Sequence, residues 1–237
     1  MAPVIRIPDE IFARLQQLAE PLVDTPATVI RKLLDAHESG TVKSKEISSA
    51  STDDNLPIFR SEAWKKSPCQ NLFLAPATTK NLKATLEHPI PIKLIESAIT
   101  AGDQDTLRNA IGMVPNVRCF AVQESSASQF HEMSAGDLVL FAEEGTGKFE
   151  YAGRVIAKLR RKELGTRLWN DPSWSLIYFL DPEQTWRIKC DKKSVIKECG
   201  YDENFWLPKF MQVRRDPIAH IKTKYGSLAQ FLVSNQI

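Results

Sequence analysis

The stretch SAGDLVLFAEEGTGKFEYAGRVIAKLRRKELGTRLWNDPSWSLIYFLD, residues 134–181, decides the fold. It contains three strand-length apolar segments, at residues 138–142, 151–159 and 176–180. A glycine-containing turn separates the first two segments, as in a β-hairpin. A long basic segment that ends in Trp169-Asn170-Asp171 separates the second from the third. Because long loops inside a compact sheet are usually functional or disordered, this segment is where we expect a binding site.

The pattern around this stretch is mixed. Residues 72–75, 117–122 and 186–190 also have strand character, and residues 92–100 and 105–111 have helical spacing. Many strands with few intervening helices are typical of a closed or nearly closed barrel rather than a doubly wound sheet. We therefore predict an α+β fold for residues 69–237, a mixed β-barrel with peripheral helices.

The first 38 residues have a pattern of their own. Residues 4–7 alternate as a short strand, and two amphipathic helices follow, the second beginning at Thr25-Pro26. A segment this short cannot bury its apolar faces alone, so we predict that residues 1–38 form a homodimer. Residues 39–68, rich in serine, threonine and charge, are predicted to be a flexible linker.

Composition excludes several classes of protein. The net charge of +2 is small, no apolar run approaches the roughly 20 residues of a membrane span, and the N-terminus lacks a signal-peptide pattern. The four cysteines lie far apart, without a CxxC pair, so we expect reduced thiols, a cytoplasmic location and neither metal nor cofactor. No P-loop, GxSxG or nuclease signature is present, which favours a binding protein over an enzyme.

Two segments resemble known families. Gly136-Asp137 before one apolar strand and Gly153 before the next form a hairpin that resembles the PUA-like superfamily, in particular its EVE, ASCH and YTH branch. WSLIYFLD, residues 174–181, is similar to the strand after the variable loop of EVE-like domains attached to restriction enzymes. IRIPDEIFARLQQLA, residues 5–19, resembles the opening of ribbon-helix-helix domains, and VDTPATVIRKLLD, residues 23–35, is similar to the N-terminal segment of SeqA-type replication regulators.

The PUA-like resemblance implies a nucleic-acid reader. YTH domains hold methylated adenine of RNA in an aromatic pocket, and EVE-like domains of McrBC-type restriction systems flip modified bases out of DNA. The ribbon-helix-helix resemblance would give Arg6 a place on a DNA-reading strand. One arginine on a mildly acidic segment is weak support for phosphate neutralisation, however, so dimerisation alone is favoured there.

Such a reader needs basic side chains for phosphates and aromatic walls for the base. The candidates for the nucleic-acid backbone are Arg154, Lys158, Arg160, Arg161, Lys162 and Arg167. The candidates for the base pocket are Trp169, Trp174, Asn170, Asp171, Tyr151, Phe149 and Asn81. Each has an alternative role: the basic run could be a solvated face, the aromatic residues could be core, and Asn170 and Asp171 could cap a turn.

These features together favour a dimeric DNA-binding specificity protein of a prokaryotic restriction or defence system that reads a modified, flipped base. RNA is a second candidate ligand, a nuclease or ATPase a candidate partner, and no membrane association is expected. One alternative is a ribbon-helix-helix regulator of transcription or replication with a C-terminal ligand-sensing domain. The other is a restriction endonuclease with an unrecognised catalytic site.

Overall fold

The computed structural model describes residues 56–60, 71–112 and 114–237 of the chain. The predicted dimerisation segment, residues 1–38 with Arg6, lies outside these residues, as does most of the predicted linker. The described residues belong to one compact unit, Asp54–Ile237. No helix among them is both long and apolar enough to span a lipid bilayer.

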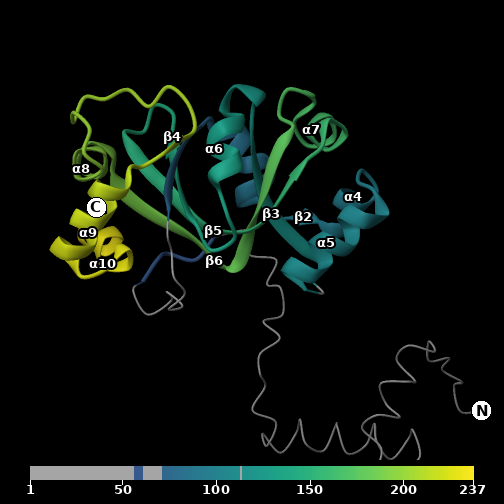
Figure 1. Cartoon of the computed structure of the whole chain (residues 1–237), viewed down its shortest axis with the longest axis horizontal. Helices are drawn as coiled ribbons and strands as arrows, with labels where there is room; N and C mark the ends of the chain where they lie inside the picture. The colour runs from purple at the N-terminus through teal and green to yellow at the C-terminus, as the bar shows by residue number, and fades with distance from the viewer. Residues whose placement is uncertain (1–55, 61–70, 113) are drawn as a thin grey trace, which may run out of the picture. The chain divides into compact units, whose positions relative to one another are not determined.

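A seven-stranded mixed sheet forms the centre of this unit (Figure 1). Its order is β2-β3-β6-β5-β4-β1-β7. The strands are β1 (Leu72–Ala77), β2 (Ile90–Pro91), β3 (Asn116–Val122), β4 (Leu138–Glu143), β5 (Lys148–Arg160), β6 (Leu176–Asp191) and β7 (Met211–Gln212). β1 and β4 are parallel, and the other neighbours are antiparallel. The hairpin predicted from the glycine-containing turn is β4–β5, and β6 joins two segments that the sequence pattern separated.

The sheet is strongly curled, but it does not close. Phe120 of β3 and Phe141 of β4 meet edge to face, with ring centroids 5.2 Å apart. Three strand spacings separate these strands, about 14 Å in a flat sheet, so the face between them must be concave. Bulges along β5 supply the bend. The expected barrel is therefore wrong in one respect: within the described residues, the two-residue strands β2 and β7 are open edges.

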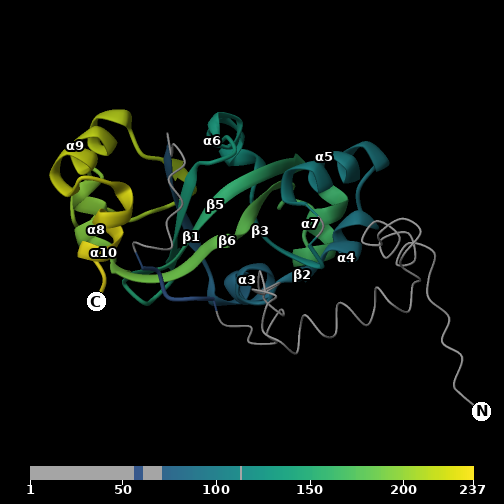
Figure 2. The same cartoon turned by 90° about the horizontal axis from the view of Figure 1, so that it is seen from below.

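Helices cover both faces of the sheet (Figures 1 and 2). They are α3 (Thr79–Leu82), α4 (Ile92–Glu96), α5 (Ala101–Ile111), α6 (Ala127–Glu132), α7 (Lys162–Trp169), α8 (Lys192–Glu198), α9 (Arg215–Tyr225) and α10 (Leu228–Ser234), with a π-helix η2 (Lys83–Glu87) and a 3-10 turn η3 (Glu124–Ser126). The convex face packs against α8, α9 and α10 at one end and against α4, α5 and α7 at the other. The concave face packs against α3, η2 and α6. Side chains alternate between the faces, so Tyr178 lies in the concave core and Phe179 in the convex one.

The Gly136-Asp137 pair that carries the PUA-like resemblance has a structural role. The buried Asp137 carboxylate accepts hydrogen bonds from the Asn71 backbone N–H (3.1 Å), the Asn71 side chain (3.1 Å) and the Ser134 N–H (2.8 Å). Gly136 has a φ of 93°, which suits glycine. The pair thus joins the start of β1 to the turn before β4, which fixes the parallel pairing of these strands.

Residues 56–60, which fall within the predicted linker but include the apolar Ile58 and Phe59, pack onto the sheet. The Phe59 N–H donates to Arg187 O (2.7 Å), and the Arg187 N–H donates to Pro57 O (2.9 Å). Phe59 is buried, and its ring meets that of Trp186 edge to face at 5.0 Å. The compact unit therefore begins before residue 69.

The predicted recognition loop contains a helix instead. Leu164 and Leu168 of α7 lie one turn apart and pack into the convex core. A Cβ at Gly165 would lie 2.3 Å from Trp174 O, so only glycine permits this close packing. The basic residues obscure this apolar stripe in the sequence. The expected long loop is thus reduced to the turn between Trp169 and β6.

Candidate nucleic-acid interface

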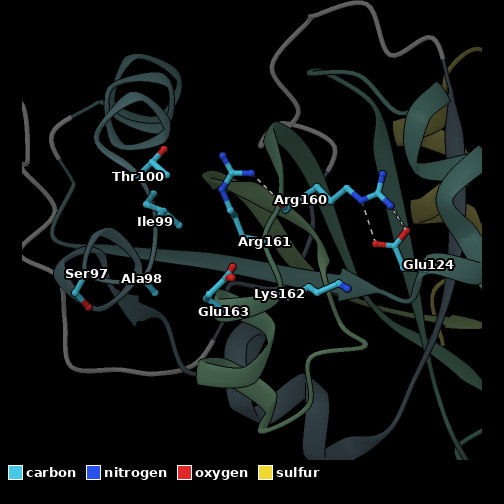
Figure 3. Close-up of a pocket in the computed structure, with 9 residues that line it drawn as sticks. All are labelled: Ser97, Ala98, Ile99, Thr100, Glu124, Arg160, Arg161, Lys162 and Glu163. Carbon is cyan, nitrogen blue, oxygen red and sulfur yellow. Dashed lines mark hydrogen bonds and ion pairs between the residues drawn. The ribbon is translucent and has the colours of Figure 1, made fainter.

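A groove of about 650 Å³ lies where β5 ends and α7 begins (Figure 3). We call it the arginine groove. It is lined by Ser97, Ala98, Ile99, Thr100, Glu124, Arg160, Arg161, Lys162 and Glu163. The C-terminal end of β5 and the first turn of α7 place the basic residues on one side of the groove. The connection from α4 to α5 forms the other side.

Both arginines of this groove are paired with carboxylates. Arg160 donates from Nε to Glu124 Oε1 (3.1 Å) and from Nη2 to Glu124 Oε2 (2.7 Å), as Figure 3 shows. Arg161 donates from Nε to Asp103 Oδ2 (2.7 Å). Hydrogen bonds from Ser175 and from Arg160 lower the pKa of Glu124, and those from Thr100 and Arg161 lower the pKa of Asp103. The groove is therefore basic in composition but largely neutralised in charge.

A smaller cavity of about 150 Å³ opens between the C-terminal ends of β1 and β3. We call it the aromatic cavity, because Phe120, Trp174 and Phe210 line it. The remaining lining residues are Ala75, Pro76, Ala121, Val122, Gln123, Ser125, Ser126, Pro208 and Lys209. Pockets for drug-sized ligands are about 300–1,000 Å³, so this volume suits a single ring system.

The groove and the cavity adjoin through residues 123–126. Glu124 lines the arginine groove, whereas Gln123, Ser125 and Ser126 line the aromatic cavity. Two hydrogen bonds fix this turn to the segment that carries Trp174: Gln123 Nε2 donates to Ser173 Oγ (3.3 Å), and Ser175 Oγ donates to Glu124 Oε1 (2.6 Å). An extended ligand could therefore occupy both at once.

A hydroxyl group without a partner lies beside the cavity. Tyr178 is fully buried, and its ring lies 6.2 Å from that of Phe120 and 5.9 Å from that of Phe210. Its hydroxyl makes no hydrogen bond within the part of the chain that the structure describes. Burial raises the pKa of Tyr178, so the group remains a protonated donor at neutral pH. An unpaired buried hydroxyl is destabilising. Tyr178 lies behind the rings that line the cavity and is not itself a lining residue.

Two residues that were predicted to contact the nucleic-acid backbone do not do so, because their side chains make hydrogen bonds within the protein. Arg154 is only 2% exposed, and it donates to Gly136 O (2.8 Å) and Gln184 Oε1 (3.5 Å). Lys158 donates from Nζ to the carbonyls of Phe130 (2.8 Å), His131 (2.7 Å) and Met133, which end α6. Burial lowers the pKa of Lys158. Neither side chain is available to a phosphate.

Two of the predicted pocket aromatics are also core residues. Phe149 packs among the residues beneath α8–α10, whereas Tyr151 lies in the concave core. A bulge between them places the two side chains on opposite faces of the sheet. The Tyr151 hydroxyl donates to Glu87 Oε1 (2.6 Å). They cannot form one pocket, and the alternative interpretation of both as core is correct.

The turn after α7 separates the two candidate tryptophans. Both pack against the convex core, but only Trp174 lines the aromatic cavity. The Trp169 ring meets that of Phe120 edge to face, with centroids 6.5 Å apart. Asn170 caps the helix in the left-handed region (φ 56°), and its N–H donates to Thr166 O (2.9 Å). Asp171 Oδ1 accepts from the Ser173 N–H (2.8 Å), and this hydrogen bond lowers the pKa of Asp171. Asn170 and Asp171 thus hold the turn, as their alternative role predicted.

The remaining candidates divide between the groove and the outer surface. Lys162 lines the arginine groove. Arg167 is exposed on α7, and Asn81 lies in α3, where its N–H donates to Thr78 Oγ1 (3.2 Å). Neither is among the lining residues of the groove or the cavity. The structure therefore brings together Arg160, Arg161, Lys162 and Trp174 from the predicted set.

Several site residues escaped sequence reasoning. Phe120 alternates in an ordinary strand pattern, and Phe210 lies far from the other cavity residues in the sequence. Glu124 and Asp103 lie 36 and 58 residues from their arginines, so no local spacing could pair them. Lys209 and Phe210 lie at the start of a segment, residues 209–224, that holds five basic residues and one acid, and this was the one available signal.

The described residues contain no group of three or more His, Cys, Asp or Glu side chains placed to hold a metal ion. The described cysteines, Cys119, Cys190 and Cys199, are buried as free thiols. Burial raises the pKa of Cys190 and of Cys199 to about 12, which keeps both thiols protonated at neutral pH.

Comparison with known proteins gives one informative likeness. No protein-family model and no curated protein matches the chain. A solved structure of the N-terminal domain of McrB from Thermococcus gammatolerans, bound to m5C DNA, is similar with a TM-score of 0.50 and 14% sequence identity. The likeness covers 65% of this chain and 96% of that one. At this identity the likeness concerns the fold alone.

Proposed function

We propose that this protein binds DNA and holds one modified, extruded base in the aromatic cavity while the adjoining backbone lies in the arginine groove. The observation that carries this proposal is the shared turn at residues 123–126, which lines the cavity on one side and the groove on the other. A strand that follows the groove can thus deliver one base to the cavity.

The cavity has the chemistry that an extruded base requires. Extrusion loses stacking and pairing worth roughly a few kcal/mol, which the pocket must replace with aromatic contacts and hydrogen bonds. Phe120, Trp174 and Phe210 offer the aromatic contacts. Gln123, Ser125 and Ser126 offer polar groups, and Lys209 offers a cation at the cavity wall. A methyl group on the base would add apolar contact.

The arginines would hold the DNA backbone by exchanging their carboxylate partners for phosphates. Exposed ion pairs such as Arg160–Glu124 contribute only about 0.2–1 kcal/mol, so a phosphate can replace the carboxylate with little loss. Arg160 and Arg161 would then each present a guanidinium to a phosphate, with Lys162 beside them. These contacts would position the strand without reading its sequence.

DNA is the proposed ligand, rather than RNA, because the McrB domain that shares this fold was solved with m5C DNA. A role as the specificity protein of a restriction or defence system follows from the same likeness. A nuclease or ATPase partner, a cytoplasmic location and a homodimer formed by residues 1–38 are further parts of this proposal. Light scattering of the full chain tests the last part, for which a dimer is the expected result.

A panel of duplexes tests the central claim. Each duplex carries one 5-methylcytosine, 5-hydroxymethylcytosine, N6-methyladenine or unmodified base, and affinity is measured at fixed salt. The parent should prefer one modified duplex. Trp174→Ala should lose that preference, because a stacking contact contributes about 1–3 kcal/mol, but should keep weak salt-dependent binding.

Trp169→Ala is the matched control, because both tryptophans pack against the convex core but only Trp174 lines the cavity. It should lower the melting temperature and leave the preference intact. Trp174→Phe, which retains a stacking ring, covers the case in which Trp174→Ala fails to fold. A Trp174→Ala protein that is folded and discriminates as well as the parent would sink the proposal.

A further inference from the structure

A second groove, of about 500 Å³, lies around the β4–β5 turn and the segment that follows α8. We call it the lysine groove. It is lined by Thr146, Gly147, Lys148, Asp191, Lys192, Lys193, Glu203, Asn204, Phe205, Trp206 and Ile237. These residues come from the β4–β5 turn, the start of α8 and the segment that follows α8. None of them was a candidate in the sequence.

Trp206 is displayed on this surface. It is 75% exposed, whereas Trp186 is buried and Trp169 and Trp174 are half-buried. Large exposed aromatic residues are typical of binding surfaces, because a ring that contacts only water gains nothing from folding. An exposed ring is also available for stacking.

The segment around Trp206 is held on both sides. Phe205 stacks on Tyr201 with ring centroids 4.8 Å apart, and Leu207 is buried in the core beneath α8–α10. The Asn204 and Phe205 N–H groups both donate to Asp202, to Oδ1 (2.8 Å) and to the carbonyl O (2.8 Å). The exposure of Trp206 is therefore a feature of an anchored segment.

The lysines of this groove lack carboxylate partners. Within the described part of the chain, Lys148, Lys192 and Lys193 make no ion pair within 4.0 Å. Asp191 lines the same groove, but its carboxylate caps α8 by accepting from the Ser194 N–H (2.8 Å) and Oγ (2.7 Å). The carboxylate of Glu203 also lines the groove, so its three ammonium groups outnumber its two side-chain carboxylates, and none of the three is ion-paired within the described residues.

We infer that the lysine groove holds the DNA strand on the far side of the extruded base, with phosphates on its lysines and one base stacked on Trp206. Unpaired cations next to an exposed aromatic ring are the composition of a surface that binds unstacked nucleic acid. This inference rests on the proposed function, because it treats the aromatic cavity as the centre of the same DNA site.

The chain itself connects the two sites. Residues 203–206 line the lysine groove, and residues 208–210 line the aromatic cavity. The Cα atoms of Trp206 and Phe210 can be at most about 14 Å apart, since each residue spans at most about 3.6 Å. At about 3.4 Å per nucleotide of duplex, the stacked base lies within roughly four nucleotides of the extruded one. The strand would pass from the arginine groove, across the cavity, to the lysine groove.

The experiment uses the full chain and a duplex with one 5-methylcytosine, next to its unmethylated counterpart. Trp206→Ala should weaken binding to both duplexes equally, by about 5- to 150-fold, as expected for one lost stacking contact. Trp206→Phe should restore most of the affinity. The double variant Lys192→Gln/Lys193→Gln should lower the slope of log affinity against log salt by about two. Lys197→Gln, on the same helix but outside the groove, should leave both quantities unchanged.

A fluorescent base locates the stacked nucleotide. With 2-aminopurine placed in turn at the four positions on each side of the methylated base, one position should be quenched by the parent and not by Trp206→Ala. Melting temperatures of all variants should match that of the parent, because the altered side chains lie at the surface.

The outcomes separate the two proposals. If the Trp206 and lysine variants bind like the parent while Trp174→Ala loses its preference, the lysine-groove inference is overturned and the proposed function stands. If Trp206→Ala weakens binding while Trp174→Ala discriminates normally, the lysine groove binds DNA, but the proposed function and the path of the strand across the cavity are overturned. A Trp206→Ala protein with unchanged DNA affinity and an altered oligomeric state in light scattering would assign the groove to a protein partner instead.

Discussion

The arginine groove and the lysine groove both contain basic side chains, but they differ in whether those side chains form ion pairs. The arginines at 160 and 161 are neighbours in the sequence, and each is paired with a carboxylate from a distant segment. The lysines at 148, 192 and 193 come from two distant segments, and none has an ion-pair partner within the described residues. The arginines that are conspicuous in the sequence are ion-paired, and within the described residues the inconspicuous lysines are not.

This difference teaches that a run of basic residues is not the same as a positive surface. Residues 154–167 contain six basic side chains, but the fold distributes them among three environments. Arg154 and Lys158 enter the interior, Arg160 and Arg161 form ion pairs, and Lys162 and Arg167 are exposed. Substitutions within this run should therefore have very different effects.

The largest effect is expected at Arg154. Arg154→Met removes the donor to Gly136 O and Gln184 Oε1 and leaves buried polar atoms unpaired, at about 1–3 kcal/mol each. The free energy of unfolding should fall by about 3 kcal/mol in urea titrations with an unchanged m-value. Arg160→Met is the matched control, and the loss of its exposed ion pair should lower stability by less than about 1 kcal/mol. Equal effects would mean that Arg154 is not an interior residue.

A smaller loss is expected at Lys158. Its ammonium group donates to the carbonyls at the end of α6. A hydrogen bond from a charged group contributes about 1.5–3 kcal/mol to protein stability. Lys158→Met should lower the free energy of unfolding by about 2 kcal/mol and leave the salt slope of DNA binding unchanged. Lys162→Met should do the opposite: stability stays within about 0.5 kcal/mol, and the slope falls by about one. A slope that falls for Lys158→Met would contradict its assignment to α6.

The fold was predictable where apolar alternation is unambiguous. The β4–β5 hairpin followed from the Gly136-Asp137 motif and the glycine-containing turn, and the opposite faces of Tyr178 and Phe179 followed from the period of a strand. The open edge of the sheet did not follow, because closure depends on the bulges in β5 and on strands of only two residues. Helix α7 was missed because its short apolar stripe, Leu164 and Leu168, lies among charged residues.

The site was less predictable than the fold. Trp174 and Arg160 were identified by residue type and by a polar or basic context. Phe120 and Phe210 meet in the cavity only because the sheet curls, and Glu124 reaches Arg160 across two strands. Local sequence does not report such contacts. Trp206 is not among the base-pocket residues predicted from the sequence, since exposure is a property of the folded chain.

A single isosteric substitution can remove one negative charge from the arginine groove. Glu124→Gln keeps an acceptor for Ser175 but removes the negative charge that Arg160 now faces. DNA affinity should rise about 3- to 10-fold, and the salt slope should steepen by about one, because a released cation can meet a phosphate. Since hydrogen bonds from Ser175 and from Arg160 hold the pKa of Glu124 below its ordinary value, the carboxylate stays charged at pH 5. Acidification to that pH should therefore not mimic the substitution.

Asp216→Asn, on α9 and outside both grooves and the cavity, makes the same change in net charge and should leave affinity nearly unchanged. If Glu124→Gln and Asp216→Asn behave alike, the arginine groove takes no part in binding. The lysine groove would then be the main backbone contact.

The smallest effect is expected at Asn170. Substitutions there test whether this residue holds the turn after α7 or contacts a base. Asn170 has a φ of 56° at the end of α7, a conformation that glycine adopts freely and alanine only at about 1–2 kcal/mol. Asn170→Gly should change the free energy of unfolding by no more than about 0.5 kcal/mol, and Asn170→Ala should lower it by about 1 kcal/mol. Neither variant should change the preference among modified duplexes, because the residue acts through its backbone. Stable variants of both kinds that lose this preference would return Asn170 to the base pocket, and the turn after α7 to the role of a recognition loop.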